Sequence, residues 1–288
     1  MPPRYRFALC NEHFEKRPLA QVCRTLRQLG YQGFEIAPFT LAEDPAAIPT
    51  SLRTEIRNTI ADEGLEFAGL HWLLAAPAGL QVSTNDAALR THSWNYVKRL
   101  IDLCADLVTP GARQNPVVVF GSPKQRSSAP GSSAAEALQF FVEGMAGVAP
   151  HAESRQVTLL VEALSPTQTD VITSLAEAVS VVRRIASPAV ETMFDVHNAI
   201  AETEPHTVLL ERYFPHIRHV HVNEMDGSEP GMGDYDFLNL LRKLSEMNYA
   251  GWVSLEAFDF SRDPRDVAAR AIETLKAAQS AGAQLQTL

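Results

Sequence analysis

The chain has 288 residues, 45% of them hydrophobic and 20% charged, which is typical of a globular protein that buries a large core. Its formal net charge of -9 argues against nucleic acid and against an anionic membrane surface as partners. Three widely spaced cysteines, no signal-peptide core and no apolar run of roughly 18 residues lead us to expect a soluble cytoplasmic protein.

Strand-like apolar segments alternate with helical segments along the whole chain. The predicted strands are 5–10, 33–37, 65–71, 117–120, 157–162, 190–195, 217–222 and 252–256. The predicted helices are 18–29, 49–63, 86–107, 134–148, 174–186, 207–214, 234–248 and 264–280, with Asp86 as the N-cap of the third. Residues 122–133, rich in Ser, Pro and Gly, are predicted to form a loop.

This alternation predicts an α/β fold in which residues 1–288 form one domain, a single (β/α)8 TIM barrel. An open doubly wound sheet fits less well, because the sequence has neither a Rossmann glycine fingerprint nor a P-loop.

Ionisable residues end the last four predicted strands: Glu162, Asp195, His221 and Glu256, separated by 33, 26 and 35 residues. Each separation is about one strand-helix unit, so in a barrel the four should meet at the C-terminal mouth. Three carboxylates and one imidazole would repel one another unless neutralised, and a divalent cation resolves this. Such an oxygen-rich set suits Mn²⁺, Mg²⁺ or Co²⁺, and Zn²⁺ is an alternative. The competing interpretation is that each carboxylate is a solvated loop residue.

Four segments, VTLLVEALSP, MFDVHNA, HVHVNE followed by PGMGDYDF, and VSLEAFDF, resemble the xylose-isomerase-like barrels. The resemblance is strongest to the ketose 3-epimerase, hydroxypyruvate isomerase and sugar phosphate isomerase/epimerase group. It implies one divalent metal, usually manganese, held by Glu162, Asp195, His221 and Glu256. It also implies that Glu162 and Glu256 form an acid/base pair. One removes the proton beside the substrate carbonyl to give a metal-stabilised enediolate, and the other returns a proton.

The sequence departs from the epimerase pattern at three positions that contact substrate in those enzymes. Asn198 stands where they carry a His, Gln168 stands where they often carry a Glu, and Gly227 stands where they often carry an Arg. These departures put simple ketose 3-epimerisation in doubt, although the metal ligands carry over.

Five further residues are predicted to contact substrate: His71, His197, Glu35, Lys124 and Arg126. For His71 a core or capping histidine is an equal alternative, and for Glu35 a salt bridge is one. Lys124 and Arg126, in the segment GSPKQR, could bind a phosphate or carboxylate, or could lie in a solvated loop. His219, two residues before His221 on the same strand face, is predicted to be its buried neighbour.

The predicted function is therefore a divalent-metal-dependent isomerase or epimerase of a sugar or related polyhydroxy carbonyl compound. One alternative is a metal-dependent lyase or dehydratase on a keto-sugar, and another is a non-catalytic sugar-binding barrel. The predicted partner is a small sugar-like molecule, and a homo-oligomer is a further possibility.

Overall fold

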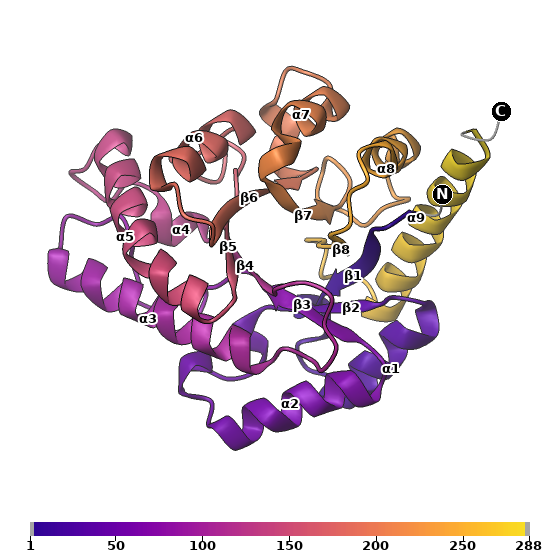
Figure 1. The fold of residues 1–288 in the computed structure, drawn as a ribbon, viewed down its shortest axis with the longest axis horizontal. Helices are drawn as coiled ribbons and strands as arrows, with labels where there is room; N and C mark the ends of the chain where they lie inside the picture. The colour runs from indigo at the N-terminus through magenta and orange to yellow at the C-terminus, as the bar shows by residue number, and fades with distance from the viewer. Residues whose placement is uncertain (1–2, 286–288) are drawn as a thin grey trace.

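Eight parallel strands close into a barrel in sequence order, so that β1 pairs with both β2 and β8 (Figure 1). The computed structural model describes residues 3–285. The strands are β1 (Arg6–Cys10), β2 (Gly33–Ile36), β3 (Glu66–Leu70), β4 (Val117–Phe120), β5 (Thr158–Val161), β6 (Val190–Asp195), β7 (Ile217–Val222) and β8 (Trp252–Leu255). The predicted single TIM barrel is confirmed, with every strand within one or two residues of its predicted bounds.

A ring of helices surrounds the barrel (Figure 1). The α-helices are α1 (Leu19–Leu29), α2 (Thr50–Asp62), α3 (Ala87–Asp106), α4 (Pro123–Arg126), α5 (Ala134–Ser154), α6 (Leu175–Ile185), α7 (His206–Tyr213), α8 (Phe237–Glu246) and α9 (Pro264–Leu285). Short 3-10 helices η1 (Asn11–Phe14), η2 (Pro38–Thr40), η3 (Pro45–Ala47), η4 (Asn198–Ala201) and η5 (Phe214–His216) lie in the connections. The short helix α4 corrects the prediction that residues 122–133 form only a loop.

Local sequence signals set several helix ends. Asp86 accepts hydrogen bonds from the backbone N–H groups of Ala88 and Leu89, which confirms it as the N-cap of α3. Ser133 and Glu136 form a capping box at the start of α5. Gly30 ends α1 at φ +96, a left-handed conformation that glycine adopts without strain.

The core is divided between the space outside the barrel and the space inside it. A large hydrophobic cluster lies between strands and helices, while two small clusters stand apart from it. One small cluster contains Trp252, which pairs in register with His219, so it shares the strand face that carries the site histidines. The barrel is therefore a packed core with polar groups at one end.

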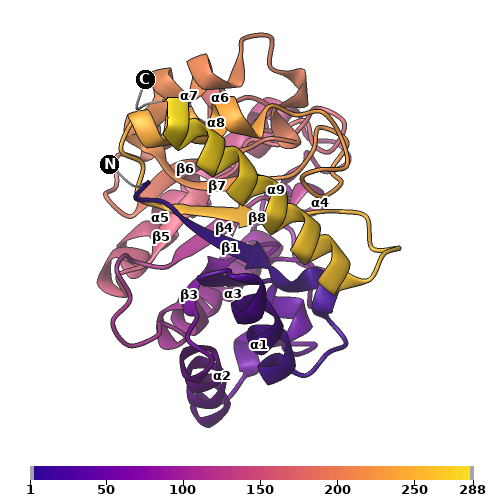
Figure 2. The ribbon, with the colours of Figure 1, turned by 90° about the vertical axis from the view of Figure 1, so that its right-hand side faces the viewer.

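The strands all point towards the same end of the molecule. In Figure 2, β1 runs from left to right, and both chain termini lie on the left, at the end where the strands begin. The connections that follow the strands consequently gather at the right-hand end, which is the C-terminal mouth of the barrel.

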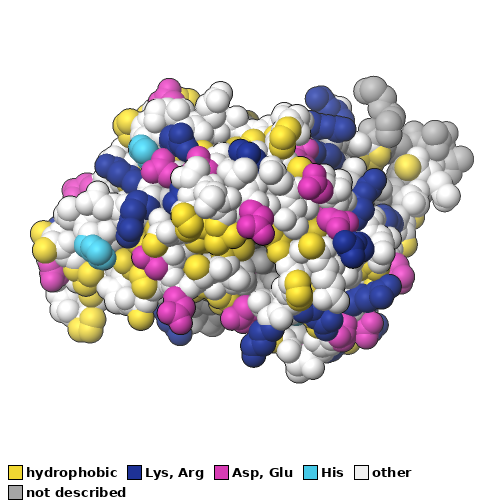
Figure 3. Space-filling view, turned by 90° about the horizontal axis from the view of Figure 1, so that it is seen from below, with side chains coloured by type: hydrophobic (Ala, Val, Ile, Leu, Met, Phe, Trp, Pro, Cys, Tyr) yellow, Lys and Arg dark blue, Asp and Glu magenta, His cyan; other side chains and the backbone are white. Residues whose placement is uncertain are grey.

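Charged side chains of both signs are interspersed on the face shown in Figure 3, so positive and negative charges there largely offset each other. Among residues 3–285 no helix has both the length and the apolar character that a membrane crossing requires.

Candidate active site

The four predicted metal ligands meet at the C-terminal mouth. Glu162 follows β5, Asp195 ends β6, His221 lies on β7 and Glu256 follows β8. Asp195 and His221 are partners in the β6–β7 register, and His221 pairs with Ser254 on β8. Parallel pairing of neighbouring strands therefore brings side chains from four separate segments to one place.

The four side chains are close enough to share one ion. Their potential ligand atoms all lie within 4.8 Å of one another. His221 Nδ1 is 3.0 Å from Glu256 Oε2 and 3.6 Å from Asp195 Oδ2. None of the four residues is more than 7% exposed. A buried set of three carboxylates and one imidazole matches the ligand preferences of Mn²⁺, Mg²⁺, Co²⁺ and Zn²⁺.

Amide side chains hold two of these carboxylates in place. Asp195 accepts hydrogen bonds from the Asn198 backbone N–H (2.7 Å) and from Asn223 Nδ2 (3.3 Å). Asn198 Nδ2 also donates to Glu162 Oε1 at 2.9 Å. Asn198 thus connects two candidate ligands from neighbouring strands, and its side chain carries no charge.

Buried polar side chains from β2, β7 and the segments after β1 and β3 pack against the candidate metal ligands. Glu35 accepts from His219 Nε2 at 2.9 Å with one oxygen and from His221 Nε2 at 3.1 Å with the other. His71 Nε2 lies 2.9 Å from Glu12 Oε2. Because Glu35 engages Nε2 of His221, the imidazole presents Nδ1 towards Asp195 and Glu256.

Other groups of ionisable side chains in the barrel interior are also close together. One contains Glu35, His219 and His221, and another contains Glu12, His71 and Glu256. Within the first, Glu35 already uses one oxygen for each histidine. The four-residue set is the candidate metal site because Glu162 and Glu256 both reach an open pocket.

Burial and crowding of negative charge shift the ionisation of the site. Burial raises the pKa of Glu162 to about 8, and the charges of Glu256 and Asp195 add to the effect. Burial alone would lower the pKa of His221, but Glu35 and the other acidic neighbours outweigh it and hold that pKa well above its usual value. Burial favours the neutral form of Glu35, yet His219 and His221 keep its pKa well below the usual range. A divalent cation at the four-residue set would relieve the repulsion that raises the pKa of Glu162.

The carboxylates open into a pocket of about 250 Å³. Glu162, Glu256, His197 and Asn198 line it together with the aromatic rings of Trp72 and Phe258. Trp72 and Ser122, which follow β3 and β4, both line it with positive φ values, +52 and +45. Left-handed backbone at non-glycine residues is strained and often marks a functional site.

The five predicted substrate contacts fall into different places. His197 lines the pocket, and its Nδ1 donates to the Met225 carbonyl at 2.8 Å, which leaves Nε2 available to a ligand. His71 and Glu35 are 0% exposed and are absent from the pocket lining, so the prediction that they touch substrate is corrected. Lys124 is exposed on α4 and lies outside the pocket lining.

Arg126 also corrects the prediction, and for a different reason. Its guanidinium is 0% exposed and donates to the backbone carbonyls of Phe120 (3.1 Å), Glu162 (2.6 Å) and Ile172 (3.3 Å). Burial lowers its pKa to about 10. Arg126 therefore ties β4 to the segment that carries Glu162 through both of its terminal nitrogens.

Several residues at the site carried little or no signal in the sequence. Phe258 and Asp226 line the pocket, and Glu12 forms the partner of His71. Phe258 lies two residues after Glu256 in VSLEAFDF, so its place in that segment could have indicated it. Glu12 comes directly after the first predicted strand, a position that could face the mouth, and it reaches the site from the 3-10 helix η1.

Comparison with known proteins places the chain in a family. The sequence model of the xylose isomerase-like TIM barrel matches residues 23–278. The chain belongs to the xylose isomerase-like TIM-barrel family.

Individual relatives of this xylose isomerase-like barrel are distant. A fructoselysine 3-epimerase of Escherichia coli O157:H7 is 23% identical over 143 residues, 48% of this chain and 52% of the relative. A probable ketose 3-epimerase of Synechocystis sp. is 23% identical over 91% of this chain and 86% of its own length. A solved L-ribulose 3-epimerase superposes with a TM-score of 0.81 at 17% identity, covering 98% of this chain and 97% of that one. The first of these matches spans about half the length of the relative, and the structural likeness establishes the fold.

Proposed function

We propose that this barrel is a divalent-metal-dependent isomerase or epimerase of a sugar or related polyhydroxy carbonyl compound. The observation that carries the proposal is the buried set of Glu162, Asp195, His221 and Glu256, two of whose carboxylates line a pocket at the barrel mouth. The epimerase names of the relatives support the same class of substrate and reaction.

Glu162, Asp195, His221 and Glu256 would hold the ion, with manganese the first expectation and magnesium, cobalt or zinc as alternatives. When bound, such an ion polarises a carbonyl oxygen and stabilises the negative charge of an enediolate, an effect of several kcal/mol.

The chain's own residues would carry the protons. One of Glu162 and Glu256 accepts the proton from the carbon beside the carbonyl, and the C–H electron pair becomes the C=C bond of the enediolate. The other glutamate donates a proton to carbon. Return to the opposite face of the same carbon gives epimerisation, and return to the adjacent carbon gives isomerisation. Asn198 holds one oxygen of Glu162, which fixes the direction of that carboxylate.

The experiment combines metal content with hydrogen exchange. Purified wild type, Glu162→Gln and His221→Ala are compared by elemental analysis after loading with Mn²⁺, Mg²⁺, Co²⁺ or Zn²⁺. Each protein is then incubated with a panel of ketoses in D₂O, and substrate deuteration is followed by mass spectrometry. We expect about one ion per chain in wild type, loss of it in the variants, and metal-dependent exchange of a substrate C–H.

The outcomes separate the alternatives. Deuterated, rearranged sugar supports an isomerase or epimerase, whereas an unsaturated product identifies the lyase. Sugar binding with neither exchange nor product identifies a non-catalytic barrel. If wild type cannot be loaded with metal and behaves like the two variants, the proposed metal site is overturned. Cytoplasmic location and self-association stay predictions.

A further inference from the structure

A second pocket of about 490 Å³ lies beside the first and shares a wall with it. Trp72 lines both pockets. Phe258 lines the first and Phe260 the second, and both belong to the connection between β8 and α9. The two hollows therefore form one continuous surface that starts at the candidate ligand Glu256 and passes across Trp72.

Three aromatic rings form the wall of the second pocket. Trp72 and Phe260 are stacked, with ring centroids 6.5 Å apart and an interplanar angle of 25°. Phe39 meets Trp72 edge-on at 5.5 Å. Phe260 is 51% exposed, the highest value among the exposed large hydrophobic residues of the described chain. With Trp72 and Phe39 this ring makes a contiguous apolar patch next to the candidate active site, and such patches mark ligand-binding grooves.

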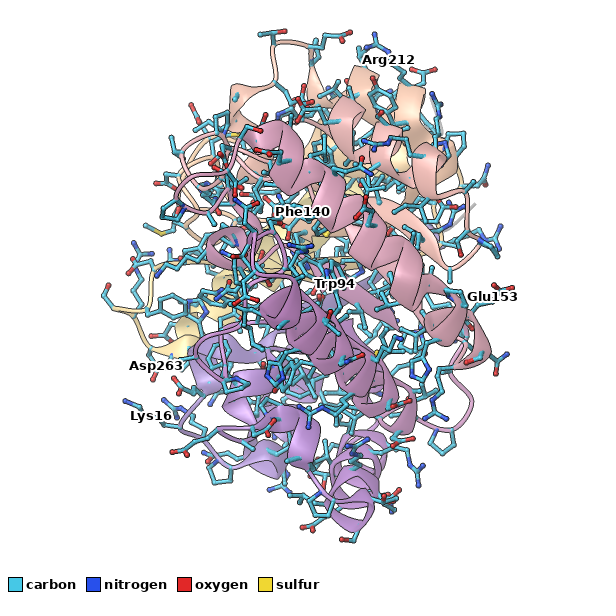
Figure 4. The ribbon with its side chains drawn as sticks, turned by 90° about the vertical axis from the view of Figure 1, so that its left-hand side faces the viewer. Lys16, Trp94, Phe140, Glu153, Arg212 and Asp263 are labelled. Carbon is cyan, nitrogen blue, oxygen red and sulfur yellow. The ribbon has the colours of Figure 1, made fainter. Side chains whose placement is uncertain are left out.

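The wall is held in place before any ligand arrives. The segment after β1 and the segment before α9 lie side by side at the barrel mouth, where Lys16 and Asp263 are labelled in Figure 4. Arg17 Nη2 donates to Asp263 Oδ2 at 2.9 Å, and His13 Nε2 lies 3.2 Å from the Asp259 carbonyl oxygen. The strained backbone of Trp72 (φ +52) further fixes the direction of its ring.

The polar groups around this wall indicate what kind of ligand it accepts. Glu12 is 4% exposed, and its Oε1 has no hydrogen-bond partner among the described residues, although His13 Nδ1 lies 4.0 Å away. Glu15 and Lys16 carry opposite charges, and Arg17 is paired with Asp263. A free buried acceptor, balanced rim charges and an aromatic platform suit an uncharged group with hydroxyl donors.

We propose that the substrate is a ketose that carries a second, uncharged sugar ring, with that second ring seated between Trp72, Phe260 and Glu12. This rests on the proposed function, because the reacting ketose would occupy the 250 Å³ pocket beside it. The apolar face of the second ring stacks on the aromatic side chains, and one of its hydroxyl groups donates to Glu12 Oε1. The second pocket then acts as a specificity site for what is attached to the ketose.

The experiment compares three substrates that differ only at O6. They are a ketohexose, the same ketohexose with a glucosyl group at O6, and its 6-phosphate. Wild type, Phe260→Ala and Val208→Ala are loaded with metal, and kcat/KM for solvent-deuterium exchange is measured for each. Val208, 39% exposed on α7, is the control for removing an exposed apolar side chain elsewhere.

Binding is measured separately through tryptophan fluorescence. Trp72 is partly exposed, whereas Trp94 and Trp252 are 7% and 0% exposed, so a ligand on the platform changes mainly the Trp72 signal. This second readout does not depend on turnover.

We expect wild type to prefer the glucosylated ketose by about tenfold in kcat/KM and in affinity, the size of one good aromatic stacking contact. Phe260→Ala should bring the ratio between the two substrates close to one, and Val208→Ala should keep the wild-type ratio. If wild type uses the ketohexose and its glucosylated form equally well, the proposed role of the second pocket is overturned while the proposed function stays intact. A preference for the 6-phosphate would overturn the proposal that the group attached to the ketose is uncharged.

The fluorescence readout separates the remaining outcomes. A Phe260-dependent preference in binding without any deuterium exchange would support the second pocket and remove the proposed catalysis. If wild type shows no deuterium exchange and no binding preference, the second pocket and the proposed function are both overturned.

Discussion

Substitution of Glu35 gives the clearest test of how the candidate metal site is supported. It is 0% exposed, and it joins His219 and His221 through its two oxygens. The substitution Glu35→Gln keeps the shape of the side chain and removes its charge. Glu35 does not reach the pocket, so its effect on metal binding acts through the orientation and basicity of His221 and through the negative charge that it adds near the ion.

The expected magnitude follows from the role of Glu35 as the partner of a ligating histidine. Loss of such a partner weakens metal binding about 10- to 100-fold, which corresponds to about 1.4 to 2.7 kcal/mol. An amide can accept from only one of the two histidines through its single oxygen, while its NH₂ group faces the other. His221 therefore loses either its hydrogen bond or its fixed orientation, and Nδ1 is presented less often towards Asp195 and Glu256.

The assay is competition for Mn²⁺ against a chelator, with the fold of each variant checked by circular dichroism at the same temperature. Glu191→Gln is the matched control. Glu191 also joins a histidine and a second base, His216 Nδ1 at 3.0 Å and Arg218 Nη2 at 2.7 Å, at the opposite end of the barrel. A folded Glu35→Gln protein with the metal affinity of wild type and of Glu191→Gln would refute the reasoning.

Three further predictions follow from the same geometry. First, metal-free protein should lose stability as pH rises from 7 to 8. Glu162, with its pKa raised to about 8, keeps its proton in the folded state and has already lost it when unfolded, so the slope from this group is at most about 1.4 kcal/mol per pH unit. The raised pKa values of His71 and His221 act in the same direction. Urea unfolding in EDTA measures this trend, and excess Mn²⁺ should oppose it because its ligands bind as deprotonated groups; a stability that rises with pH in EDTA would contradict the assignment. Second, Gly121→Ala should slow deuterium exchange by about 10²-fold, because the new Cβ would collide with Glu162 Oε2 and displace that carboxylate. Gly147→Ala, whose Cβ meets no atom within 4 Å, is the control, and equal rates for both variants would count against a role for Glu162. Third, Arg126→Met should destabilise the protein by about 3 kcal/mol or more, since three buried carbonyls lose their donor, whereas Lys124→Ala on the same short helix should leave the unfolding midpoint unchanged. Similar midpoints for the two variants would show that the buried guanidinium contributes little.

The barrel could be predicted because each strand is a short apolar segment that ends at a turn or a polar residue. Val117–Phe120 has all four side chains buried, and its predicted bounds are those observed. The four candidate ligands followed from the same pattern, since parallel strands in sequence order must bring their C-terminal ends together. The spacing of the apolar segments and the order of the strands along the sequence thus determine which residues converge at the mouth.

Long-range contacts explain where the prediction failed. The helix predicted over 234–248 begins only at Phe237, because the backbone N–H of Tyr235 donates to Glu224 Oε2 and holds the preceding residues in a loop. The helix predicted to end at 148 continues to Ser154 through Pro150, with Ala152 buried against the core. Arg126 lies in a polar segment that looks solvated, and only the positions of three distant carbonyls explain its burial.

Two of the three departures from the epimerase pattern, Gln168 and Asn198, line the pocket. Gln168 Nε2 donates to Asn198 Oδ1 at 2.8 Å, and Asn198 donates in turn to Glu162. Two positions that differ from the pattern therefore contact each other, and both carry neutral amides.

The third departure, Gly227, is matched to its surroundings in the same way. A side chain at this position would collide with Phe258 and approach His197, and the backbone there has φ +84. Phe258 and His197 thus fill the space where an arginine would otherwise reach the pocket. With neutral amides beside Glu162 and an aromatic ring in place of a cation, this part of the pocket has little positive charge with which to bind an anionic substrate. The candidate metal ligands match the pattern of the family, whereas this altered side is consistent with the proposal of a neutral substrate that differs from a simple ketose.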